Sequence, residues 1–155
     1  MNKPLVADRQ AAFNIAWDAF VVQKKPPSVL PGSPGGVQSG IVCCYYNKSG
    51  GAANRCAIGL LLKEETAQGL ANVRSTIGSI LYKAQNALQK KASDEVSHLG
   101  EEFLVWLQMA HDDAAFATMG ISSVAGGGFE RRNFHDEVRD SLLCLAQAFK
   151  LEIPK

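Results

Sequence analysis

The sequence predicts a mainly α-helical (α+β) protein, with about four substantial helices around one core and a small β-hairpin-like element near residues 41–55. Three observations support this fold class. Apolar residues recur at helical spacing in four long segments, one short run is β-branched and aromatic, and glycine- and proline-rich stretches separate these segments. The length of 155 residues fits a single domain over 1–155, since domains commonly hold roughly 100–200 residues.

The first predicted helix runs from Asp8 to about Gln23. The Asp8 side chain is placed to accept hydrogen bonds from the free amides of the first turn, and Pro26-Pro27 stop the helix. Its apolar face contains Phe13, Trp17, Phe20 and Val21.

Two segments, about 26–40 and 121–129, are predicted to be flexible loops. The first holds four glycines and two prolines between Ser28 and Gly40, and the second contains three consecutive glycines. The run from Ile41 to Tyr46 follows the first loop and has the composition of a strand. Because a single strand is not stable, it must pair with Val29-Leu30 or with the segment around 52–55.

Three more helices are predicted after a short buried helical turn at 56–62. The longest periodic pattern predicts a helix over 70–90, and the next predicted helix begins at 93–94 and extends to Met119. The apolar stripe of the helix that ends at Met119 contains Leu99, Phe103, Trp106, Leu107 and Ala110. Asn133, three residues before Asp136, predicts the start of the final helix, whose buried face is expected to include Cys144.

The charge balance and the absence of certain segments indicate the class of protein. There are 16 Lys+Arg and 15 Asp+Glu, a formal charge of +1, so the clustered positive charge of a nucleic-acid binder is missing. No apolar run approaches the roughly 20 residues that span a bilayer, and no secretory signal is visible. We therefore expect a cytoplasmic protein with four reduced cysteines, no membrane association and no nucleic-acid partner.

Cys56 is the first candidate for chemistry. It follows Arg55 at the predicted start of a helical turn, where a cation and the helix dipole would both lower the pKa of a thiol. His111 and Asp112 could supply a base and an orienting carboxylate for a nucleophilic thiol. The competing interpretation is that Cys56 belongs to the core, because cysteine is among the most buried residue types.

A zinc site is the second alternative that the residue types allow. Cys43 or Cys44, Cys56, His111 and either His98 or His135 offer sulfur and nitrogen ligands. None of these residues has the paired spacing of a structural zinc site, and adjacent strand residues point to opposite faces. We therefore expect no metal and no cofactor.

Two further groups of residues are candidates for contacts with a partner. Arg131 and Arg132 follow the glycine-rich loop, where they could bind an anion. Tyr45 and Tyr46 are aromatic residues on a predicted strand beside the glycine- and proline-rich segment, a combination that favours a contact surface.

Five segments, in a fixed order, resemble a family of small bacteriophage and prophage proteins that has no established activity. They are Phe20–Lys25, Cys44-Tyr45-Tyr46, Arg55–Leu62, Leu107–Asp112 and Leu142–Leu151. The chain departs from the family pattern at Leu60, where the family often has a second cysteine, and at 63–65, where it often has Pro-Asp-Glu.

The resemblance implies a phage-related origin and location in a bacterial host. It also groups Cys44, Tyr46, Arg55, Cys56 and His111-Asp112 as one set. One structural interpretation is that His111-Asp112 tie the end of their helix to the turn before Cys56, as a polar cluster that locks the fold.

Small phage proteins without catalytic signatures commonly act by binding a host protein. The leading hypothesis is therefore a non-enzymatic protein that binds and modulates a host protein, with anti-defence (anti-CRISPR-like) inhibition among the options. The expected contact region is the glycine- and proline-rich loops together with Tyr45-Tyr46. The alternative is a hydrolase or transferase that uses Cys56 and His111, and a homo-oligomeric assembly component stays open as a third hypothesis.

Overall fold

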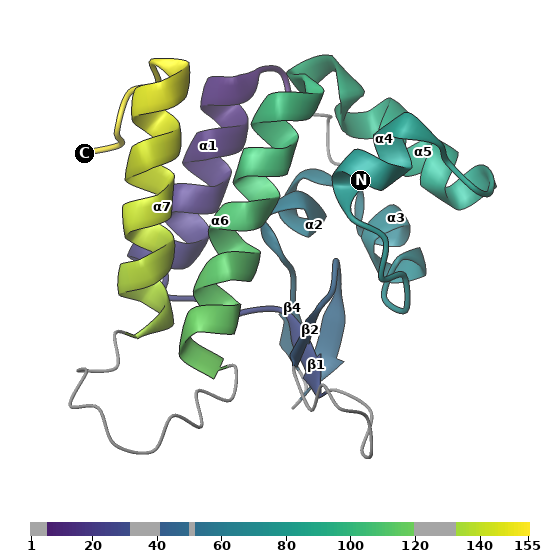
Figure 1. Ribbon diagram of the computed structural model, residues 1–155, viewed down its shortest axis with the longest axis horizontal. Helices are drawn as coiled ribbons and strands as arrows, with labels where there is room; N and C mark the ends of the chain where they lie inside the picture. The colour runs from purple at the N-terminus through teal and green to yellow at the C-terminus, as the bar shows by residue number, and fades with distance from the viewer. Residues whose placement is uncertain (1–5, 32–40, 50–51, 120–132) are drawn as a thin grey trace.

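The computed structural model describes residues 6–31, 41–49, 52–119 and 133–155, and in these residues the protein is mainly helical. Three long helices stand side by side, shorter helices pack on one flank, and the strands lie near the C-terminal end of α6 (Figure 1). The long helices are α1 (Arg9–Trp17) together with its five-residue extension Asp18–Val22, α6 (Glu101–Met119) and α7 (Phe134–Phe149). The short ones are α2 (Ala57–Leu61), α3 (Glu64–Gly69), α4 (Ile77–Tyr82) and α5 (Ala87–Val96).

The predicted first helix is confirmed, including its cap. The Asp8 carboxylate accepts a hydrogen bond from the Ala11 amide, and α1 continues into a π-helical turn, η1 (Asp18–Val22). The chain leaves this helix through Lys24, which has a positive φ of 53°.

The strands form two antiparallel pairs in the described residues. β1 (Val29–Pro31) pairs with β2 (Ile41–Cys43), and β3 (Asn47–Ser49) pairs with β4 (Ala52–Asn54) as the predicted hairpin-like element. Of the two partner segments offered by the sequence, the strand at 41–43 therefore uses the one at Val29-Leu30, whereas residues 52–54 pair with 47–49. The single strand predicted over 41–46 is wrong in extent, since three consecutive side chains from Cys44 to Tyr46 are buried, which an alternating strand cannot achieve on one face.

The segment predicted to be a first flexible loop, 26–40, is only partly described. Its residues 29–31 form strand β1, and Ser28 is fully buried, so this part is not the surface loop that its composition predicted. Residues 32–40 and the second predicted loop, 121–129, lie outside the described residues.

The prediction of one continuous helix over 70–90 is wrong. Two separate helices, α4 and α5, occupy the second half of this segment, and each begins at a polar cap. The Thr76 hydroxyl accepts from the Ser79 amide, and the Asn86 side chain accepts from the Gln89 amide. The apolar pattern correctly marked buried positions, including Leu70 in the turn after α3, but burial alone does not require one helix.

The helix predicted from 93–94 to Met119 begins later than expected. Residues 93 and 94 belong to α5, which continues into a 3-10 turn, η2 (Ser97–Leu99), before α6 starts. Gly100 separates the two with a φ of +91°, and a Cβ there would lie 2.5 Å from Arg9 Nη2. Arg9 also donates from Nε to the Leu99 carbonyl at 2.6 Å, so α1 fixes the start of α6.

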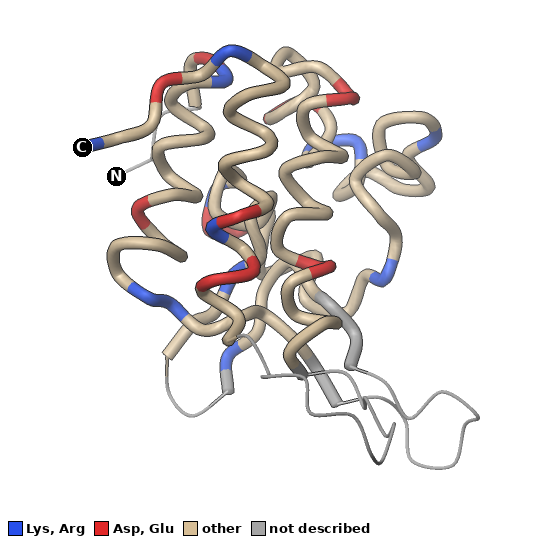
Figure 2. Tube along the Cα trace, turned by 60° about the vertical axis from the view of Figure 1, so that its left-hand side comes forward, with Lys and Arg blue, Asp and Glu red and all other residues tan. Residues whose placement is uncertain are grey.

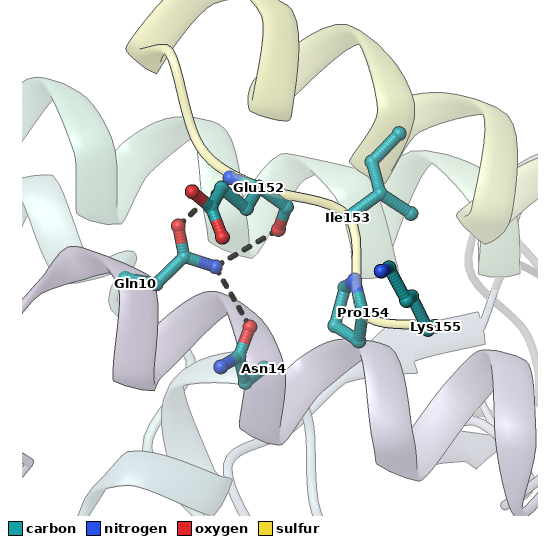
Figure 3. A pocket seen from close by; sticks show the side chains of 6 residues that line it. All are labelled: Gln10, Asn14, Glu152, Ile153, Pro154 and Lys155. Atoms are coloured by element: carbon teal, nitrogen blue, oxygen red, sulfur yellow. Dashed lines mark hydrogen bonds between the residues drawn. The ribbon is translucent and has the colours of Figure 1, made fainter.

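The final helix is confirmed, and the tail after it packs back on α1. Asn133 caps α7 by accepting from the Asp136 amide. Gln10 then holds the tail at two points, because its Oε1 accepts from the Glu152 amide at 2.8 Å and its Nε2 donates to the Glu152 carbonyl at 2.9 Å (Figure 3). The same Nε2 donates to Asn14 Oδ1 at 2.8 Å.

One hydrophobic core cluster joins all of these helices. α6 runs through its centre and packs against α7, α2, α4 and β2. Within the described residues, no helix combines the length and apolarity that crossing a bilayer needs.

A buried carboxylate connects α5 to the start of α3, which leads to the first prediction. Glu95 accepts from the Lys63 amide at 2.8 Å and from the Thr66 hydroxyl at 2.7 Å. Glu95→Ala leaves both donors without their partner, and we expect it to lower the free energy of unfolding in urea by about 1–3 kcal/mol. Asp94→Ala is the matched control, since it removes one exposed ion pair with Lys90 and should cost less than about 0.5 kcal/mol. Equal losses in the two variants would contradict the role assigned to Glu95.

Candidate functional site

His111 is the centre of a buried polar cluster. It lies in the middle of α6, not at its end as the sequence suggested, and its side chain is fully buried. Nε2 accepts a hydrogen bond from the Ser28 amide at 3.0 Å, and Nδ1 lies 2.7 Å from Asp112 Oδ1. Because an acceptor nitrogen carries no proton, the imidazole is the neutral form with its proton on Nδ1, donated to the Asp112 carboxylate.

Ser28 connects His111 to both strand pairs. Its carbonyl accepts from the Cys44 amide at 3.0 Å, and its hydroxyl donates to the Asn54 carbonyl at 3.1 Å. The hydroxyl also lies 3.4 Å from Cys44 Sγ. The proposed connection between the α6 histidine and the segment before Cys56 therefore runs through Ser28, a residue that the sequence did not single out.

Cys56 begins α2 as a capping residue. Its Sγ accepts from the Gly59 amide at 3.4 Å, and the side chain is buried. Burial, with a smaller contribution from the Asp112 charge, raises the pKa of the Cys56 thiol to about 12. The lowered pKa expected from the helix start and from Arg55 is therefore wrong, because desolvation outweighs the dipole of a five-residue helix.

The Arg55 side chain contacts groups other than Cys56. Its guanidinium pairs with Glu64 and lies over the Tyr46 ring at 5.7 Å from the ring centroid. The cation therefore has two partners of its own, neither of which is Cys56.

The glycine at position 59, three residues after Cys56, is explained by close packing. A Cβ on Gly59 would lie 2.0 Å from the Tyr45 carbonyl oxygen, so α2 approaches the chain at Tyr45 more closely than a side chain permits. Glycine at this position lets the same residue donate its amide to Cys56 and pack against the backbone of Tyr45.

The two adjacent tyrosines are buried. Tyr45 and Tyr46 are 2% and 8% exposed, so they do not form the contact surface that the sequence predicted. Tyr45 donates its hydroxyl to the Ser75 carbonyl at 2.7 Å, and burial raises its pKa. Both rings belong to the core because the chain turns inward between β2 and β3.

The remaining candidate residues are distributed over the fold or lie outside it. His98 and His135 bond the carbonyls of Val6 and Phe20. In the described part of the chain, no group of three or more His, Cys, Asp or Glu side chains is placed to hold a metal ion. Arg131, Arg132 and the side chain of Cys43 lie outside the described structure.

The geometry of the cluster does not support thiol catalysis. A nucleophilic cysteine must be a thiolate with access to substrate, whereas Cys56 is buried with a pKa of about 12. Both ring nitrogens of His111 are already bonded, and in the described residues every buried side-chain nitrogen or oxygen has a hydrogen-bond partner. Two surface hollows, one beside Gln10 (Figure 3) and one beside Arg55, are lined by neither Cys56 nor His111.

A second feature of α6, a set of exposed apolar side chains, was not predicted from the sequence. Trp106, Met109 and Phe116 are 43%, 49% and 51% exposed, although Trp106 was predicted to be in the core. We call these three residues the α6 stripe. At 100° per residue they share one face with Asp113, opposite His111. Among the described residues, only the Trp106 ring has an aromatic neighbour, Phe149, with ring centroids 6.1 Å apart.

Comparison of the chain with protein-family models, with curated proteins and with solved structures gives no match.

The burial of Cys56 predicts how the thiols react. At pH 8 the thiolate fraction of Cys56 is roughly a thousandfold below that of an unperturbed thiol with a pKa of about 8.5. Cys144 is exposed, so the prediction that it belongs to the core is wrong. Site-resolved alkylation, read by mass spectrometry, should therefore label Cys144 quickly. Cys56 should react at least a hundredfold more slowly and become as reactive as Cys144 in denaturant. Fast labelling of Cys56 in the folded protein would contradict this assignment.

The bond between His111 and Ser28 predicts a large effect on stability. His111→Ala removes the acceptor of a buried amide and leaves a cavity, so we expect a loss of about 2–4 kcal/mol in the free energy of unfolding. His135→Ala is the control, because that partly buried ring makes one hydrogen bond, and it should cost about 0.5–1.5 kcal/mol. Urea denaturation followed by circular dichroism measures both, and a smaller loss for His111→Ala would refute the central role of this bond.

Proposed function

We propose that this chain is a non-enzymatic, phage-related protein that acts in the bacterial cytoplasm by binding and modulating a host protein, with anti-defence inhibition as one such role. The observation that carries the proposal is a contrast on one helix. On its inner side, His111 is buried and bonded to Ser28 and Asp112, and Cys56, at the start of α2, is buried and bonded to Gly59. On its outer side, the same helix exposes the α6 stripe.

The buried cluster favours a structural role over a catalytic one. Each polar group that could attack or deprotonate a substrate already has an internal partner, and the cluster joins α6, β1, β4 and the region of α2. Removing the partner of a buried polar group costs about 1–3 kcal/mol, so the cluster is expensive to open.

The α6 stripe favours a binding role. Tryptophan, phenylalanine and methionine are enriched in protein interfaces, and tryptophan is among the residues that most often dominate binding energy. Three such side chains lie on one helical face, with the exposed Asp113 between Met109 and Phe116, unlike single exposed apolar residues elsewhere on a surface. The contact region proposed from Tyr45-Tyr46 is thereby replaced by one on α6.

Partner capture with a cysteine variant tests the proposal. The protein, tagged and expressed in bacteria, is crosslinked in cells and purified, and its partners are identified by mass spectrometry. We expect one bacterial protein in a stoichiometric complex, retained equally by wild type and by Cys56→Ser, since the serine hydroxyl can still cap α2. The absence of any stoichiometric partner, or loss of the partner in Cys56→Ser with the fold intact, would overturn the proposal.

A further inference from the structure

We infer that the α6 stripe is a docking surface for an amphipathic helix that carries Lys or Arg at two positions about eleven residues apart, facing Glu102 and Asp113. The inference rests on the proposed function and specifies the chemistry of the partner. The occupant is a helix of another protein, recognised by shape along the stripe and by charge at these two positions.

The geometry of α6 suits a helical partner. α7 packs along α6 on one side, and the short helix α4 packs against α6 on another (Figure 1). Met109 and Phe116 are seven residues apart, and Trp106 precedes Met109 by three, so the three apolar groups extend over about three turns on one side. A partner helix with apolar residues at i, i+3 or i+4, and i+7 presents an apolar face of about two turns, which is long enough to cover Trp106 and Met109.

The exposed charges on this face of α6 have one sign. Glu102 lies one turn before Trp106, and Asp113 lies one turn after Met109, between Met109 and Phe116. Both are exposed, and α6 contains no Lys or Arg. Figure 2 shows acidic residues at two levels of α6 with uncharged helix between them. From Glu102 to Asp113 the helix rises by about 16 Å at 1.5 Å per residue, so the complementary basic groups should be about eleven helical residues apart.

The same charges argue against a second copy of this chain as the occupant. If two α6 stripes packed antiparallel, the Glu102 end of each helix would face the Asp113 end of the other. A parallel pairing would place identical acids together. Either arrangement brings carboxylates against carboxylates beside an apolar contact, which is unfavourable, whereas a basic-ended helix neutralises both ends.

Two synthetic peptides test the partner chemistry. Both are helical, with leucines at i, i+3 and i+7, and they differ only in carrying Lys or Glu at two positions eleven residues apart. Binding is measured as the fluorescence anisotropy of the labelled peptide added to the whole protein. We expect the Lys-ended peptide to bind saturably, at least tenfold more tightly than the Glu-ended twin.

Variants of the protein locate the binding surface. The double variant Trp106→Ser with Met109→Ser should weaken binding of the Lys-ended peptide at least tenfold. Tyr82→Ser, which removes an aromatic ring that is 89% exposed on α4, should leave binding unchanged. Glu102→Lys with Asp113→Lys should reverse the preference between the peptides, whereas Glu152→Lys, on the tail, should not.

Several outcomes would overturn the inference. They are equal binding of the two peptides, no saturable binding, or a wild-type dimer in light scattering that Trp106→Ser dissociates. A bacterial partner that is captured equally well by the stripe variant would also overturn it, while leaving the proposed function in place. Selective binding of the Lys-ended peptide without any captured bacterial protein would support this surface chemistry and overturn the proposed function.

Discussion

The hydrogen bond from the Ser28 amide to His111 is the constraint on which the rest of the fold depends. It fixes the segment before β1 to the middle of α6, and the Ser28 carbonyl and hydroxyl then bind Cys44 and Asn54. Two pairs of three-residue strands are too short to be stable alone. Since a buried amide without an acceptor is costly, the strands keep this position as long as the imidazole is present.

The hydrogen bonds that stabilise the cluster already use the side chains that thiol catalysis would need. Cysteine, histidine and aspartate in one region are the components of a thiol enzyme, but here each is used in structure. Cys56 caps a short helix, and its high pKa follows from the same burial that makes the cap effective. Proximity of reactive residue types is therefore weak evidence for catalysis when each of them is already hydrogen-bonded within the protein.

Local signals predicted the parts of the fold in which a polar residue caps an apolar period, as at Asp8 and Asn133. They failed over 70–90, because apolar spacing records burial and several short elements can bury the same positions. Of the cluster, the sequence identified Cys44, Cys56 and His111-Asp112, but Ser28 was hidden in a segment whose composition resembles a loop. The exposure of Trp106 depends on which neighbours cover α6, and periodicity in one helix does not contain that information.

In α6, the residues that stabilise the fold and the residues that we propose to bind a partner lie on opposite sides of the helix. Within the described residues, α4 and α7 pack against α6, and one face of α6 keeps three apolar side chains exposed. These residues, Trp106, Met109 and Phe116, are not partners in the hydrogen bonds of His111, so those bonds do not depend on them. In the proposed function these side chains are available to a partner, and Glu102 and Asp113 on the same face favour a partner with basic groups.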